Sequence, residues 1–98
     1  MNDYFIDIDL PPHFDQTFMS LIPEQRAFIN KMMNKGSISS YSLSMDRTKL
    51  WVTVKANTES EAEKLFGKFP LYEWMNGAII PLMFHQGVNV ALPQPSLN

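Results

Sequence analysis

The residues best suited to chemistry are one histidine and a pair of aspartates at opposite ends of the chain. His85 closes an apolar run that begins at Ala78, and an imidazole titrates near neutral pH, so it could act as a general acid or base. Asp7 and Asp9 lie in an alternating segment, where both side chains point to the same face of a strand. Two carboxylates held together could share a proton, which would raise the pKa of one of them toward that of a useful base. We therefore predict His85 and Asp7 as the catalytic candidates.

Each candidate also has a plain structural interpretation. His85 could be hydrogen-bonded at a contact between subunits, and Asp7 could pair with a Lys or Arg while Asp9 lies in water. His13 follows Pro12 at a helix start, where a solvent-facing or capping role is expected. No spacing of the histidines and aspartates favours a metal site, so we predict none.

Binding residues for a small molecule are predicted from one arginine and four aromatic side chains. Arg26 is expected on a helix, where its planar guanidinium could hold a substrate carboxylate or close a salt bridge. Arg47, the only other arginine, lies in a polar turn and is expected in solvent. The predicted apolar wall consists of Tyr41, Trp51, Tyr72 and Trp74. The last two would serve equally well as anchors of a subunit interface, where aromatic residues concentrate.

The elements that would position these residues begin with a strand over 4–10. Its side chains alternate strictly between an apolar and a more polar face, and Pro11-Pro12 ends it. Apolar residues then recur at three- and four-residue steps from His13 to Lys35, which predicts a helix. The apolar stripe keeps its phase across Pro23, so we favour one distorted helix over a turn followed by a helix that starts there. Gly36 is placed to end this helix.

A hairpin is predicted next, with strands over 38–45 and 50–55 and a polar turn over 46–49. In the first of these strands Tyr41 alternates with serines, which could present hydroxyl groups on the opposite face.

The last part of the chain predicts a short helix and a final strand. Thr58 and Glu61 form a capping box before the helix, and Gly67 lies at its end. The final strand is expected over 78–85. Pro81 cannot donate to a sheet ladder, so this strand is at an edge, bulged, or free on one side.

The resulting order, β-α-β-β-α-β, predicts a ferredoxin-like α+β fold with an antiparallel sheet. Two helices would cover one face of the sheet and leave the other bare, which is a liability for a lone chain. Burying the bare face against a second copy would make a dimeric α+β barrel. We predict one domain over 1–86, a homodimer or higher homo-oligomer, and a tail over 87–98 that is either disordered or packed on a neighbouring subunit.

Composition narrows the class of protein further. A net charge of −2 without a basic patch argues against nucleic-acid binding, and no apolar run reaches membrane-spanning length. The chain contains no cysteine, which excludes a disulfide framework and a thiol nucleophile. Charged residues make up only 18%, which favours partial covering of the surface by partner subunits. The acidic N-terminus is unlike a signal peptide, so a cytoplasmic protein is expected.

The run Phe69-Pro70-Leu71-x-x-x-Met75, followed by a strand with Ile80-Pro81-Leu82-x-x-His85, resembles the C-terminal half of the muconolactone isomerases. Asp7, Pro11 and Gly36 extend the match more loosely toward the N-terminus. The resemblance implies a cofactor-free enzyme that shifts a double bond in a small unsaturated lactone carrying a carboxylate. It also implies dimeric barrels that assemble into larger rings in the cytoplasm.

The chain departs from this family at two places. Gln25-Arg26 stands where the family has a Glu-Lys pair, and Phe84 stands where the family has an arginine before the final histidine. Gln25 cannot act as a base, and Arg26 can bind a carboxylate but stays protonated. Two alternatives therefore stay open beside the isomerase: a non-catalytic ligand-binding or assembly module, and a cofactor-free monooxygenase of the same barrel architecture.

Overall fold

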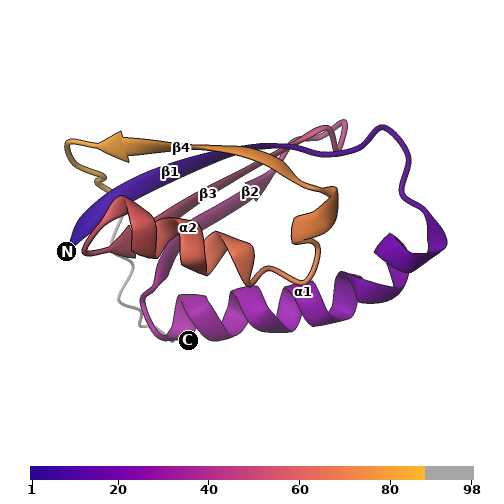
Figure 1. Cartoon of the computed structure of the whole chain (residues 1–98), viewed down its shortest axis with the longest axis horizontal. Coiled ribbons are helices and arrows are strands. Elements are labelled where there is room, and N and C mark those ends of the chain that lie inside the picture. The colour runs from indigo at the N-terminus through magenta and orange to yellow at the C-terminus, as the bar shows by residue number, and fades with distance from the viewer. Residues whose placement is uncertain (88–98) are drawn as a thin grey trace, which may run out of the picture.

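The computed structural model describes residues 1–87, and it has the predicted ferredoxin-like α+β architecture. Its elements are β1 (Asn2–Asp9), α1 (Gln16–Asn34), β2 (Ile38–Leu43), β3 (Lys49–Ala56), α2 (Glu59–Gly67), the 3₁₀ turn η1 (Tyr72–Trp74) and β4 (Asn76–Leu82). The sheet order is β2-β3-β1-β4, and each pair of neighbours is antiparallel. Figure 1 shows α1 and α2 on the same face of the sheet. The prediction for the tail falls on 88–98, outside the described residues.

The core lies between this helix pair and the sheet. Alternation along β1 and β3 turns one set of apolar side chains toward the helices, as the period of two predicts. The helices meet them with residues spaced at three and four positions. The buried members include Tyr4, Ile6, Ile8, Leu50, Val52, Val54, Ile29, Met32, Ala62 and Phe66.

Helix α1 runs unbroken through Pro23, which confirms the interpretation as one helix. It begins at Gln16 rather than near His13, because the Asp15 side chain accepts a 2.7 Å hydrogen bond from the backbone N–H of Phe18 and caps the first turn. His13 is exposed and is not the cap.

The C-terminal end of α1 forms a Schellman motif, as predicted from Gly36. The backbone N–H of Gly36 donates to Met33 (3.0 Å), and that of Ser37 donates to Met32 (2.9 Å). Gly36 has φ +81°, a left-handed conformation that costs a glycine little. The chain can therefore turn directly from α1 into β2.

A β-bulge between Ile38 and Ser40 changes the faces of β2. Strict alternation would place Ile38 and Tyr41 on opposite faces, but the extra residue brings both to the helix-covered face. The strand ends at Leu43, not at Met45, which is fully exposed. The turn begins there because Asp46 accepts hydrogen bonds from the side chain of Ser44 and from Thr48.

Strand β4 is at the sheet edge, which accommodates Pro81 as predicted. It runs from Asn76 to Leu82 rather than from Ala78 to His85. Its last pair joins Leu82 to Asp3 near the beginning of β1, so residues 83–85 have no strand to pair with on that side. At the other end of β4, Gly77 approaches the Phe66 ring of α2 closely, and an added Cβ would lie 2.7 Å from two ring carbons.

Helix α2 carries the predicted cap in a slightly different form. The Thr58 hydroxyl accepts from the backbone N–H of Glu61 (3.2 Å), as a capping box requires. The Glu61 carboxylate accepts from the N–H of Asn57, one residue before the cap. The cap thereby pairs one of the free N–H groups in the first turn of α2, and the Glu61 carboxylate pairs the N–H of the residue before the cap.

Candidate ligand-binding pocket

A pocket of about 650 Å³ that is open to solvent on one side lies between helix α1 and the sheet. Most of its lining is apolar and comes from the end of β1, the start and middle of α1, β2, β3 and the segment before β4. The apolar lining includes Leu10, Phe14, Phe18, Ile22, Leu50 and Met75, and the polar side chains are Gln25, Arg26, Asn30 and Tyr41. A pocket of this volume, with few polar groups in an apolar wall, is typical of small-molecule sites.

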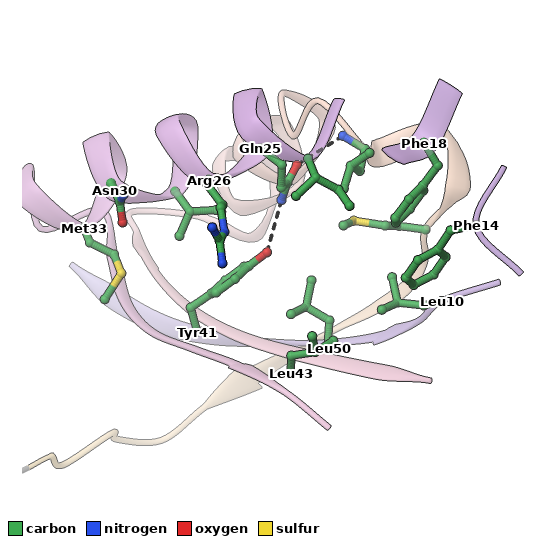
Figure 2. A pocket seen from close by; sticks show the side chains of 14 residues that line it. Leu10, Phe14, Phe18, Gln25, Arg26, Asn30, Met33, Tyr41, Leu43 and Leu50 are labelled. Atoms are coloured by element: carbon green, nitrogen blue, oxygen red, sulfur yellow. Dashed lines mark hydrogen bonds between the residues drawn. The ribbon is translucent and has the colours of Figure 1, made fainter. Parts of the chain in front are cut away.

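Gln25 is the buried polar residue of this pocket, with only 3% of its surface exposed. Its side-chain oxygen accepts a 3.1 Å hydrogen bond from the backbone N–H of Leu71, and its amide nitrogen donates to the Tyr41 hydroxyl at 3.4 Å (Figure 2). It connects the middle of α1 to β2 and to the segment before β4. Gln25 was considered above only as a residue that cannot act as a base. Its place between Ile22 and Ile29 on the apolar stripe was the signal that it would be buried.

Tyr41 projects from β2 toward α1, and Figure 2 shows its hydroxyl inside the pocket. Burial raises the pKa of its phenol, because the charged phenolate is poorly solvated there, and the hydrogen bond from Gln25 acts in the opposite direction. The phenol is therefore neutral at physiological pH. It can donate a hydrogen bond to a ligand but is a poor base.

Arg26 is the only charged side chain among the lining residues. It follows Gln25 on α1, so it lies at the edge of the buried stripe, and Figure 2 shows it hanging from the helix beside Tyr41. Within the described chain the ion pairs shorter than 4.0 Å are formed by Lys49 and Lys55, and Arg26 takes part in none. Its guanidinium is thus free to meet an anion at the pocket.

Asp7 lies on the face of the sheet that the helices leave uncovered, away from this pocket. Its carboxylate is 2.8 Å from the Lys49 ammonium, which is also 2.7 Å from Asp9. The indole N–H of Trp51 donates to Asp7 at 3.1 Å. The two carboxylates share the Lys49 ammonium, and its hydrogen bonds, first with Asp7 and then with Asp9, raise the pKa of Lys49. This geometry matches the structural interpretation of Asp7 as an ion-paired residue. A cavity between this face and a second copy stays a prediction.

Of the seven predicted site residues, the pocket brings together Arg26 and Tyr41. His85 follows the end of β4 and is exposed, and Trp51 accompanies Asp7 on the uncovered face. Of the predicted apolar wall, Tyr41 lines this pocket, whereas Trp51, Tyr72 and Trp74 are not among its described lining residues, so a shared wall stays a prediction.

The two aromatic residues of η1 support the fold around the pocket. Tyr72 packs edge-on against Phe66 of α2, with ring centres 4.9 Å apart. Trp74 packs edge-on against Phe18, which does line the pocket, and its indole N–H donates to Asp15 at 3.4 Å. Trp74 does not line the pocket but stabilises one end of it by packing against Phe18.

Comparison with known proteins adds no assignment: no family model matches this chain, and a search of curated proteins found no match. Residues 1–87 contain no cluster of three or more His, Asp or Glu side chains that could hold a metal ion. In the same part of the chain, neither helix has both the length and the apolar character needed to cross a membrane.

Proposed function

We propose that this chain binds a small unsaturated organic acid in the pocket between α1 and the sheet. The observation that carries the proposal is a single exposed cation without an ion-pair partner, Arg26, on the lining of a mostly apolar pocket in the described chain. A guanidinium can hold a carboxylate through two parallel hydrogen bonds, while the apolar wall takes the ring or chain of the ligand. The resemblance to muconolactone isomerases supports the same ligand class, a lactone that carries a carboxylate.

A carboxylate series tests this proposal directly. Benzoate and its neutral isostere benzamide would be titrated into the protein and followed by NMR shifts of the pocket residues. We expect benzoate to bind about two- to five-fold more tightly, because Arg26 is exposed and an ion pair in solvent contributes about 0.2–1 kcal/mol. Arg26→Gln should abolish the preference, and Arg47→Gln is the matched control because it removes the other arginine, from the hairpin turn. Equal binding of both compounds, or an unchanged preference in Arg26→Gln, would contradict the proposal.

A second candidate function is the cofactor-free double-bond shift of the muconolactone isomerases. Arg26 and Tyr41 favour it, because they could hold the carboxylate and donate a hydrogen bond to the ring carbonyl. They are also the titratable side chains among the lining residues of the described chain, and neither is a base near neutral pH. Because His85 and Asp7 lie outside the pocket of one chain, a catalytic role for either needs a second copy beside it.

Deuterium uptake from heavy water into muconolactone, followed by NMR, tests the isomerase candidate. Uptake that requires Tyr41 together with His85 or Asp7 would support proton transfer across two copies, so Tyr41→Phe, His85→Ala and Asp7→Asn are the informative variants. A wild-type protein that binds benzoate but catalyses no uptake would be a binding module.

We further propose that the uncovered face of the sheet pairs with a second copy of the chain. Phe5, Trp51 and Ile80 lie on this face, and Ile80 is 46% exposed. An exposed apolar surface of this kind is typical of interaction sites. Light scattering should give the mass of a dimer or larger ring for the wild type, and a smaller mass for Ile80→Glu. Met45→Glu, on the exposed hairpin turn, is the control that should leave the mass unchanged. A monomeric wild type would contradict this proposal.

A further inference from the structure

The orientation of the Gln25 side chain is decided by chemistry. The backbone N–H of Leu71 is a donor only, so the atom of Gln25 that faces it must be the amide oxygen, as found at 3.1 Å. The NH₂ group is then the atom that faces Tyr41, at 3.4 Å. Because the amide is 3% exposed and held on both sides, it cannot reverse without leaving the Leu71 N–H unpaired in the interior.

This orientation determines what Tyr41 can do. An NH₂ group only donates, so the Tyr41 oxygen accepts from Gln25 and its own proton is not used in that bond. Within residues 1–87 the Tyr41 hydroxyl makes no other hydrogen bond. The Tyr41 O–H is therefore an unused hydrogen-bond donor on the pocket lining. Arg26 and Asn30 also place donors on this lining. Tyr41 is half-buried, so this O–H is available to donate a hydrogen bond to an acceptor on a ligand in the pocket.

We propose that the pocket recognises a second feature of its ligand, a neutral carbonyl oxygen, through the O–H of Tyr41, with Gln25 as the positioning residue. This inference rests on the proposed function, in which Arg26 holds the carboxylate of the same ligand. The ligand class is thereby narrowed to small oxo-acids, lactone acids and related compounds that carry a carbonyl group beside the carboxylate. Simple aliphatic or aryl acids of the same size would bind through Arg26 alone.

The test uses the three isomeric acetylbenzoates and the corresponding isopropylbenzoates, which have the same shape but lack the carbonyl. Dissociation constants are measured by calorimetry, and each result is expressed as the ratio between the two compounds of a pair. For at least one isomer we expect the acetyl preference to fall about five-fold in Tyr41→Phe, as expected for the loss of one hydrogen bond. Arg26→Gln should weaken both members of a pair equally and leave the ratio unchanged.

These variants separate the inference from the function on which it rests. If Arg26→Gln weakens both acids while Tyr41→Phe leaves every ratio unchanged, carbonyl recognition is wrong and acid binding stands. If Tyr41→Phe changes a ratio while Arg26→Gln affects neither acid, the carbonyl contact stands and the anchor of the acid is wrong.

The positioning role of Gln25 has its own readout in Gln25→Glu. An ionised carboxylate at this position would accept a hydrogen bond from the Tyr41 O–H, which would then no longer point toward a ligand. The protonated carboxyl group would still donate a hydrogen bond to the Tyr41 oxygen. The acetyl preference should therefore be present at low pH and lost at high pH, with no such change in the wild type between about pH 5 and pH 9. Arg26 of α1 and Tyr41 of β2 are the titratable side chains among the described lining residues, and the other lining elements contribute side chains without titratable groups. A ratio that does not depend on pH in this variant would refute the positioning role.

Discussion

Replacement of Gly77 by alanine tests the closest approach between β4 and α2. The added Cβ would lie 2.7 Å from two carbons of the Phe66 ring and 3.3 Å from a methyl carbon of Ile6. The first distance is about 1 Å shorter than an ordinary carbon contact. The Phe66 ring cannot move away freely, because it is 6% exposed and packs edge-on against Phe69 and Tyr72. The backbone at Gly77 has no positive φ, so the clash is the main effect.

Overpacking of this kind costs about 1–3 kcal/mol, and the reduced chain entropy of the unfolded alanine variant offsets about 0.5–1 kcal/mol. We therefore expect Gly77→Ala to lower the free energy of unfolding by about 1–2 kcal/mol. The measurement is urea unfolding followed by tryptophan fluorescence. Gly67→Ala is the matched control: nothing lies within 4 Å of its added Cβ at the end of α2, so this change should be neutral or stabilising.

A double-mutant cycle identifies the cause. Phe66→Leu shortens the side chain and should make room for the new methyl group, so Gly77→Ala should cost about 1 kcal/mol less in that background. If Gly77→Ala is as stable as Gly67→Ala, or if the two substitutions at Gly77 and Phe66 are additive, the steric argument is wrong.

Three further predictions concern local hydrogen bonds and ionisation. Hydrogen bonds, above all from the Thr48 hydroxyl, lower the pKa of Asp46. The stabilising effect of the Asp46 carboxylate should therefore be present near neutral pH and lost as pH falls through its folded pKa. The urea midpoints of wild type and Asp46→Asn should accordingly converge at about pH 2. Because the pKa of Tyr41 is raised, its contribution to folding stability is present below the ordinary tyrosine pKa and is lost as pH rises through the folded pKa. In a spectroscopic pH titration, the phenolate absorbance that wild type shows and Tyr41→Phe lacks should therefore appear only above about pH 10. Its appearance at lower pH would contradict burial of the phenol. Asp15→Ala should lower the melting temperature by removing the α1 cap, at a cost of about 1 kcal/mol, whereas Asp15→Asn should retain most of the stability; equal losses would show that the cap is unimportant.

Local features were predictable because their causes lie within a few residues. The order of strands and helices, the continuity of α1 through Pro23 and the end of α1 at Gly36 all follow from periodicity and cap chemistry. Pro81 correctly indicated an edge strand, because a missing N–H restricts where a strand can pair. Element ends were less predictable. The end of β4 depends on where its partner β1 begins, which is not a local property.

The candidate site was predictable only in part. Arg26 and Tyr41 were selected for their chemistry, and the structure brings them to one pocket. Gln25 was overlooked because an amide has no acid–base chemistry, although its position on the helical stripe indicated burial. Trp51 was assigned to the same wall as Tyr41, but Tyr41 pairs with Val52 and Ser42 pairs with Trp51, so the register of β2 with β3 places the two rings on opposite faces. A one-residue shift in register is enough for such an exchange of faces.

The sequence by itself thus determined the fold class, the order of its elements and the apolar face of β1. These properties depend on periodicity and on backbone preferences that act between near neighbours. Only the tertiary structure decided which functional groups meet. The contact of Gln25 with Leu71 spans 46 residues and that of Trp51 with Asp7 spans 44. Such contacts depend on strand order, register and the packing of α1 on the sheet, which no single segment encodes. For that reason Arg26 and Tyr41 share a pocket while Asp7 and His85 lie outside it.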